Sequence, residues 1–140
     1  MRLEHLYRLR FSYTEGWEVG TGGPTRQRFG LAEGRCDGRI AGRFRGGNHA
    51  RVRTDGVVLP DVQGFITTDD GATLLCDYRG RGRTLDDGSF EVVATAIHVS
   101  GDERYAHLND VVCAIEGGSG PADEEVEIEV YELVWEEVAE

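Results

Sequence analysis

Histidine side chains with polar neighbours are the residues of this sequence best suited to chemistry. His107 lies in "RYAHLND" (104–110), where Tyr105 and Asn109 share its phase if a β-strand begins this early. Such a strand would turn an imidazole, a phenol and a carboxamide into an apolar lumen, as a small-ligand pocket requires. The same residues could instead form one helical turn before the strand "VVCAI" (111–115).

His49 follows two glycines in "GGNH" (46–49), and we expect it at the mouth of the same pocket. Because histidine titrates near neutral pH, His107 and His49 are the candidate catalytic acid and base. A purely structural role is the alternative for each histidine. The candidate substrate-binding side chains, which would orient polar atoms of a ligand, are Asn48, Gln63, Tyr78 and Asn109.

The segment "TTDDGATLLCDYRG" (67–80) holds the acids that could form a catalytic pair. Asp69 and Asp70 precede a glycine between two β-rich runs, which is typical of a hairpin turn. Asp77 alternates with apolar residues, so we expect it on the outside of a barrel beside Arg79. We therefore predict no carboxylate pair.

The sequence lacks the residues or motifs that several other kinds of catalytic and binding site require. The sequence contains no lysine, which excludes a Schiff base and the lysine of a phosphate-binding loop. The four histidines are isolated and no Cys-X-X-Cys motif occurs, so we predict no metal and no cofactor. The motif "GGSGP" (117–121) has no strand–turn–helix pattern around it and is not a nucleophile elbow.

The elements that must position these residues have the pattern of β-strands. "LEHLYRLRFSY" (3–13) alternates apolar and polar residues, and so does "EEVEIEVYELVW" (124–135) until a phase break that a bulge would explain. About eight short strands separated by turn signals predict one all-β domain over 1–140, an antiparallel closed or nearly closed barrel with at most one short helical turn. Pairing of the acidic last strand with the first would close it.

Charge is distributed unevenly along the chain. The net charge is −11, yet segment 123–140 holds nine acids and no base, while 26–53 holds eight arginines and two acids. We expect these segments to lie close together; the alternative is an arginine-lined mouth that attracts an anionic ligand. Overall acidity argues against nucleic acid and anionic membranes as partners. Three widely spaced cysteines, no signal-peptide pattern and no membrane-length apolar run predict a cytoplasmic location.

The segments 46–49, 54–56, 67–80 and 104–110, in this order, resemble the domain of unknown function 3237 family. The resemblance implies a small single-domain β-barrel over the whole chain, similar in outline to calycin and allene oxide cyclase barrels that hold small apolar molecules. The chain departs from the family pattern at Asn48 and His49, in place of aspartate and tryptophan, at Gln63, in place of arginine, and at His107, in place of tryptophan. The chemistry of its pocket is expected to differ accordingly.

Three functional hypotheses follow. The first is a cofactor-independent cyclase, isomerase or lyase acting on a small apolar or aromatic molecule. The second is a non-catalytic carrier or sensor for such a molecule, and the third is a subunit whose lumen is filled by its own side chains. A homodimer is plausible for so small a barrel.

Overall fold

The computed structural model describes residues 1–122 and 124–137 of the chain. Within these residues, no helix has the length and apolar character needed to cross a membrane. The described elements are β1 (Arg2–Gly20), β2 (Arg26–Gly38), β3 (Gly42–Val52), β4 (Val58–Leu59), β5 (Asp61–Thr68), β6 (Thr73–Thr84), β7 (Phe90–Val99), the 3-10 helix η1 (Ala106–Asp110), β8 (Val112–Ser119) and β9 (Glu125–Val134).

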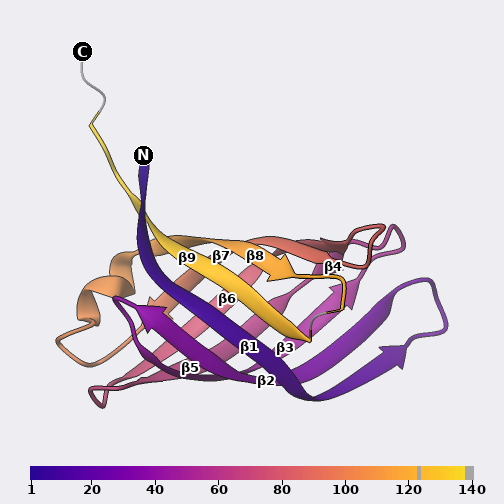
Figure 1. Ribbon diagram of the computed structural model, residues 1–140, viewed down its shortest axis with the longest axis horizontal. Helices are drawn as coiled ribbons and strands as arrows, with labels where there is room; N and C mark the ends of the chain where they lie inside the picture. Colours follow the sequence, from indigo (N-terminus) through magenta and orange to yellow (C-terminus); the bar gives the residue numbers. More distant parts are fainter. Residues whose placement is uncertain (123, 138–140) are drawn as a thin grey trace.

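Eight of these strands form a closed antiparallel ring (Figure 1). Each strand in the series β1, β2, β3, β5, β6, β7, β8 and β9 pairs with the next, and β9 pairs with β1. The two-residue β4 bridges β3 and β6 at one end of the ring. The predicted all-β antiparallel barrel of about eight strands is confirmed, although β1, with 19 residues, is longer than expected.

The pairing of β1 with β9 closes the ring. It aligns Arg8 with Glu129 and Arg10 with Glu127, and the two arginine Nε atoms lie 2.5 Å and 3.1 Å from their carboxylate partners. The predicted pairing of the acidic last strand with the first strand is therefore confirmed.

The arginine-rich segment 26–53 has different partners from those expected. Arg35 Nη2 lies 2.7 Å from Asp69, at the turn between β5 and β6. Among the described residues, Arg39 alone links this segment to β9, with its Nη2 at 2.5 Å from Glu132. The predicted proximity of the basic and acidic segments is therefore largely wrong, because β1 separates β2 from β9 in the ring.

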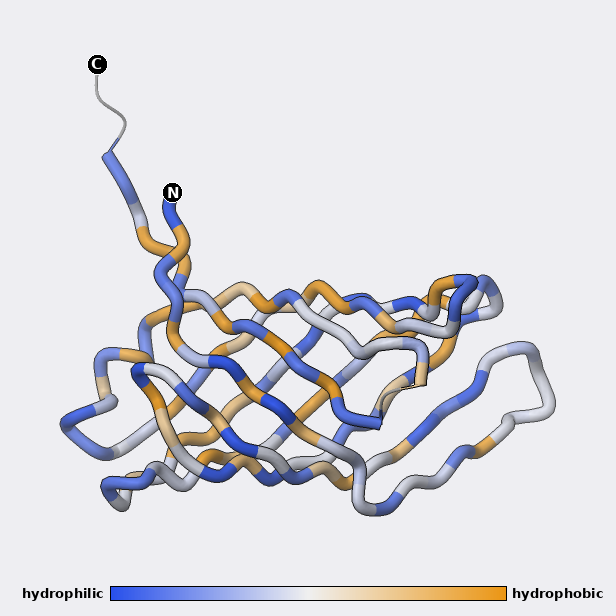
Figure 2. The backbone as a smooth tube through the Cα atoms, in the orientation of Figure 1, coloured by the Kyte–Doolittle hydropathy of each residue, from blue (hydrophilic) through white to orange (hydrophobic). Residues whose placement is uncertain are grey.

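Apolar and polar residues alternate along much of the strands (Figure 2), and the buried apolar side chains fill the inside of the ring. On β6, the side chains of Leu74, Cys76 and Tyr78 are buried. Asp77 points outward, with its Oδ1 3.2 Å from Arg79 Nε. The predicted faces of this strand are confirmed.

Asp69 and Asp70 lie in a tight turn between β5 and β6. Gly71 adopts a positive φ of 92°, and its N–H donates to Thr68 O at 3.0 Å. Asp69 pairs with Arg35, and Asp70 accepts a hydrogen bond from Thr68 Oγ1. These contacts are those of a structural turn, as predicted.

The segment 104–110 adopts the helical alternative rather than the strand. In η1 the helical period replaces alternation, so that Leu108 is buried while His107 and Asn109 are exposed. Asn109 accepts from Ser100 N at 2.7 Å and donates to Ser100 O at 3.0 Å. The prediction that His107 and Asn109 line the lumen is therefore wrong.

Gly80 on β6 marks a point where two strands approach too closely for a side chain. A Cβ there would lie 2.2 Å from Val93 O and 2.5 Å from Ala94 Cα. Gly80→Ala is therefore expected to lower the free energy of unfolding by about 3 kcal/mol, because backbone must move. Urea denaturation measures the change.

Gly101 provides the matched control. A Cβ at Gly101 would meet nothing within 4 Å, and Gly101→Ala should change stability by about 0.5 kcal/mol or less. Equal stability of the Gly80 and Gly101 variants would contradict the close strand approach.

Candidate functional site

The interior of the ring is divided into a filled half and an open half. The half nearest η1 is filled by buried side chains that include Leu6, Tyr7, His98, Leu108 and Cys113. The other half holds a cavity of about 630 Å³, within the usual range for small-ligand pockets. The lumen is thus only partly filled, contrary to the third hypothesis.

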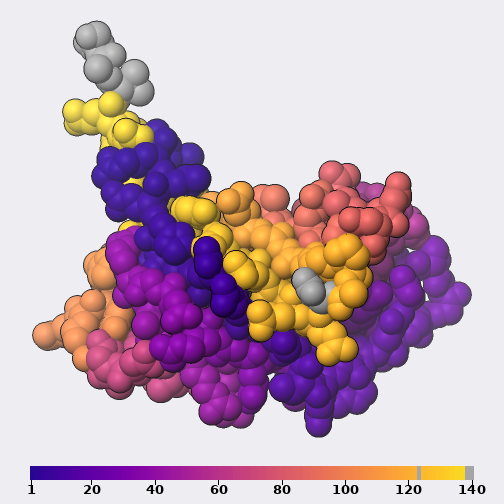
Figure 3. Space-filling model, in the orientation of Figure 1, coloured from indigo at the N-terminus to yellow at the C-terminus, as the bar shows by residue number. Residues whose placement is uncertain are grey.

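The β1–β2 hairpin projects beyond the other strands at one end of the barrel (Figures 1 and 3). Residues of this hairpin, among them Gly16, Trp17 and Phe29, belong to the cavity lining, which places the opening at this end. The β6–β7 and β8–β9 turns border the same opening. The lining is mainly apolar and aromatic and includes Phe11, Phe44, Tyr78, Ala94, Ile115 and Ile128. Such a lining is suited to an apolar or aromatic ligand.

Two glycines position the aromatic wall of the cavity. Gly46 and Gly64 are paired across β3 and β5, and a Cβ on either would lie 2.9 Å from the Phe44 ring. Their missing side chains therefore make room for this ring. Phe44 in turn stacks on Tyr78, with ring centroids 6.1 Å apart and planes inclined by 14°.

Tyr13 and Asn48 form a polar pair in the lining, nearer the mouth. Asn48 Oδ1 accepts from the backbone N–H of Asp61 at 3.0 Å, which fixes the orientation of the amide. Asn48 Nδ2 then donates to Tyr13 Oη at 2.9 Å. Because the phenol oxygen accepts this bond, the Tyr13 O–H is left to donate elsewhere.

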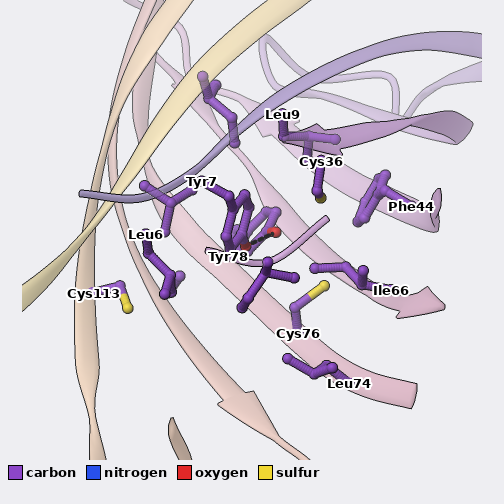
Figure 4. Packing of buried hydrophobic residues seen from close by; sticks show 14 of the residues in the cluster. Leu6, Tyr7, Leu9, Cys36, Phe44, Ile66, Leu74, Cys76, Tyr78 and Cys113 are labelled. Carbon is purple, nitrogen blue, oxygen red and sulfur yellow. Dashed lines mark hydrogen bonds between the residues drawn. The ribbon is translucent and has the colours of Figure 1, made fainter. Parts of the chain in front are cut away.

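Tyr78 is also the first member of a buried hydrogen-bonded chain. Its hydroxyl lies 2.5 Å from that of Tyr7 (Figure 4), and Tyr7 Oη lies 2.8 Å from His98 Nε2. On the other side of the imidazole, Cys113 Sγ is 3.9 Å from Nδ1. The chain connects the cavity wall with the centre of the filled half.

Burial keeps this chain uncharged at neutral pH. It raises the pKa of both Tyr7 and Tyr78 well above 10.0, and it lowers the pKa of His98 from 6.5 to about 4. The pKa of the Cys113 thiol is raised to about 11 by the same cause. These four side chains are therefore neutral at neutral pH, and they can donate or accept hydrogen bonds without a buried charge.

The structure brings two of the six predicted site residues into the cavity lining, Asn48 and Tyr78. Gln63 is exposed because it follows the inward-facing Val62 on β5. His49 is exposed because its neighbour Asn48 takes the inward position; its Nε2 lies 2.7 Å from Gln27 Oε1. The predicted positions of Gln63 and His49 at the pocket are therefore wrong.

Neither Tyr7 nor His98 is among the predicted site residues. Strand alternation is consistent with an inward position for both, and both are buried. The signal lay in their shared inward phase, whereas their meeting depends on strands that are distant in sequence.

Neither thiolate nor metal chemistry is indicated by the described residues. Cys36, Cys76 and Cys113 are free and buried, and burial raises the pKa of Cys76 to about 12. In residues 1–122 and 124–137, no three His, Cys, Asp or Glu side chains are grouped as metal ligands.

The fold and site define a closed antiparallel β-barrel with a ligand-sized cavity at one end. The chain belongs to the family described as "Protein of unknown function (DUF3237)", whose model matches residues 1–133. The family resemblance of the sequence motifs is thus confirmed. No match was found among the curated proteins.

Solved structures share this fold at low sequence identity. A β-barrel-like protein from Acinetobacter baumannii is 20% identical with a TM-score of 0.81, and 94% of each chain is covered. A protein of unknown function from Rhodopseudomonas palustris is 16% identical with a TM-score of 0.82, over 95% of this chain and 97% of that one. An enzyme from Penicillium herquei is 18% identical with a TM-score of 0.70, and 93% of each chain is covered.

The pKa of His98 predicts an acid-dependent loss of stability. Between pH 6.5 and about 4, the unfolded chain binds a proton at this histidine that the folded chain does not. The free energy of unfolding should therefore fall as the pH is lowered through this window, by up to about 3 kcal/mol, and this contribution should level off below it. Urea denaturation at a series of pH values measures it.

A His98→Gln variant separates this effect from the titration of carboxylates. In this variant the free energy of unfolding should depend on pH only through the carboxylates. If the free energy of unfolding depends on pH in the same way in the wild type and the variant, His98 does not have a lowered pKa.

Proposed function

We propose that the protein binds a small apolar or aromatic molecule in the open half of its lumen and acts on it without a cofactor. The reaction would be a cyclisation, isomerisation or elimination. The observation that carries this proposal is a cavity of about 630 Å³ whose mainly apolar and aromatic lining includes Phe11, Phe44 and Tyr78.

The composition of the lining supports this class of ligand. Phe11, Phe44 and the ring of Tyr78 offer aromatic surface, whereas Tyr13 and Asn48 offer a few oriented polar groups. Apolar walls with a small number of fixed polar groups suit ligands that bury most of their surface and are oriented by one or two hydrogen bonds.

Tyr78 is the group we assign to acid–base chemistry, in place of His107 and His49. It belongs to the cavity lining, and Tyr7 holds its hydroxyl in a hydrogen bond. A preorganised donor in a dry site can stabilise developing charge on a ligand oxygen. The filled half of the barrel supplies this preorganisation.

The Arg28 and Glu18 side chains of the cavity lining are already paired with each other, which favours a ligand whose main part is neutral. Arg28 belongs to the lining, but its Nε lies 3.5 Å from Glu18 Oε2. An anionic group on the ligand would have to compete with Glu18 for this arginine. We therefore place any such group at the mouth and the neutral, apolar part beside Tyr78.

Binding can be tested with 2-naphthol as the probe, followed by amide chemical shifts in ¹H–¹⁵N spectra. Shifts are expected at Phe44, Tyr78 and Ala94. Ala94→Phe, which fills the cavity, should weaken binding by at least about tenfold through lost space and contact. Val93→Phe is the matched control, because Val93 is the adjacent residue and is 70% exposed. Equal loss in both variants, or shifts confined to the exterior, would contradict a lumen site.

Proton exchange of 2-tetralone in D₂O distinguishes a catalyst from a protein that only binds its ligand. An acid–base enzyme should accelerate exchange of the protons next to the carbonyl over the buffer rate, as followed by ¹H NMR. Tyr78→Phe should bind the ketone and lose about 100-fold or more of this acceleration. Binding without accelerated exchange in the wild type would assign the protein as a carrier.

A further inference from the structure

We propose that the outer wall of the barrel around β7 is the contact surface of a symmetric homodimer, in which β7 of one subunit lies along β7 of a second copy of this chain. The residues that carry this proposal are on the outside of the wall and are not part of the cavity lining. The inference is therefore independent of the function proposed above.

Large apolar side chains form a patch on the outside of three adjacent strands. The patch consists of Leu75 on β6, Val93, Ile97 and Val99 on β7, and Val112 on β8, which are between 50% and 70% exposed. Leu75 pairs with Val99 and Ile97 pairs with Val112, so the patch is continuous. On a chain with a net charge of −11, such a cluster of exposed apolar side chains indicates an interaction surface.

Most charged side chains beside the patch are neutralised within the subunit. Ion pairs join Arg79 to Asp77, Arg83 to Glu91, and Arg8 to Glu129. Charges that are already paired can lie at the edge of an interface without either partner being left alone.

Arg81 and Glu116 are different, because neither forms an ion pair within residues 1–122 and 124–137. Arg81 Nη1 donates to Gly80 O at 2.8 Å, and Glu116 Oε1 accepts from Tyr131 Oη at 3.4 Å. The two charged residues are in one row across the sheet, since Arg81 pairs with Val93 and Val93 pairs with Glu116. Two strand spacings, about 10 Å, separate their backbones.

The outer wall beside Val93 is hollowed by a groove of about 860 Å³. Its lining includes Arg81 and Arg83 of β6 on one side of β7, and Glu116 of β8 and Glu127 of β9 on the other. A surface that is basic on one side and acidic on the other is complementary to a copy of itself when the two sides are exchanged.

A two-fold axis parallel to β7 makes this exchange. It places β7 against its own copy and β6 of each subunit over β8 of the other. Because Arg81, Val93 and Glu116 share a row, Arg81 then faces Glu116 of the partner subunit, and Glu116 faces the partner's Arg81. Two intersubunit ion pairs would thus flank the contact between the two copies of Val93.

The same axis also brings apolar side chains together. The apolar residues of β7 meet their own copies, and Leu75 comes beside the partner's Val112, because their partners on β7, Val99 and Ile97, are two residues apart. A barrel wall offers only a few strands to such a contact. We therefore expect a total buried area near the lower limit for a specific interface, about 1,000 Å², and a micromolar dissociation constant.

An axis across the strands, the other way to pack the two walls, would not join the unpaired charges. Each strand would then cover its own copy, so that Arg81 would face β6 and Glu116 would face β8 of the partner subunit. The two arrangements therefore differ in whether Arg81 and Glu116 meet, and charge reversal distinguishes them.

The contact surface is tested first by sedimentation velocity of the full chain from about 1 µM to about 500 µM, which spans the expected dissociation constant. The wild type should change from monomer to dimer over this range. Val93→Glu, which places two carboxylates at the centre of the contact, should raise the dissociation constant by at least about 100-fold. Val19→Glu is the matched control, because Val19 is 61% exposed but lies on the β1–β2 hairpin; it should leave the dissociation constant unchanged.

Charge reversal then tests the axis. Arg81→Glu and Glu116→Arg should each weaken the homodimer by about tenfold or more, because each places two pairs of like charges across the interface. An equimolar mixture of the two variants restores both pairs with opposite charge, so a heterodimer of about wild-type affinity should form. Native mass spectrometry with one variant ¹⁵N-labelled identifies it. Arg51→Glu, at an exposed arginine of β3 outside the patch, is the control and should have no effect.

Every outcome decides the proposal. Loss of the dimer in Val93→Glu together with a heterodimer in the mixture supports it, and the heterodimer shows that both charge variants are folded. A wild type that stays monomeric throughout the concentration range would overturn it, and so would a dimer that survives Val93→Glu. A mixture of the charge variants that stays monomeric would overturn the axis parallel to β7. None of these results affects the cavity, whose ligand binding is measured separately with 2-naphthol.

Discussion

Closure of the sheet through β1 and β9 is the constraint on which the interior depends. In a closed ring every strand has one face inside, and a shift by one residue would exchange the faces. The β1–β9 register contains such a shift between His5 and Tyr7. Leu6 and Tyr7, although adjacent, are therefore both buried. This irregularity, held by pairing on either side of it, brings the Tyr7 hydroxyl to the middle of the lumen.

Aromatic rings inside a small barrel need space that ordinary side chains would occupy. Glycine supplies it at the site: Gly46 and Gly64 lie against the Phe44 ring, and a Cβ on Gly30 would lie 2.6 Å from the Tyr13 ring. The glycines thus do more than form turns. Those within β2, β3 and β5 allow large rings to lie flat along the wall, and the remaining volume becomes the cavity.

The sequence was sufficient for the closed antiparallel ring, the turn at Asp69 and Asp70, and the inward position of Tyr78, because each follows from alternation or local turn chemistry. The same alternation failed in β1. Strict alternation through segment 3–13 would put Leu3 and His5 on the same face as Tyr7, but the bulge turns both outward, where His5 Nε2 lies 2.6 Å from Glu129.

Other errors had a different origin. Asn48 and His49 were both assigned to the pocket, although neighbouring strand residues face opposite sides. Which half of the lumen is filled depends on the combined volume of side chains from eight strands, and the 3-10 geometry of η1 depends on contacts such as that between Asn109 and Ser100. Neither is encoded in a local pattern.

The choice of His107 and His49 rested on the free pKa of histidine, and the structure shows why that criterion misleads here. Both of these imidazoles are on the outer surface, away from the cavity. Inside the barrel a charged imidazole would be costly, and His98 is accordingly held neutral. What the interior offers a ligand is therefore a set of oriented neutral hydrogen bonds. Among the residues of the cavity lining, Asn48 is held in this way by the backbone N–H of Asp61 and by Tyr13, and the Tyr78 hydroxyl is held by Tyr7.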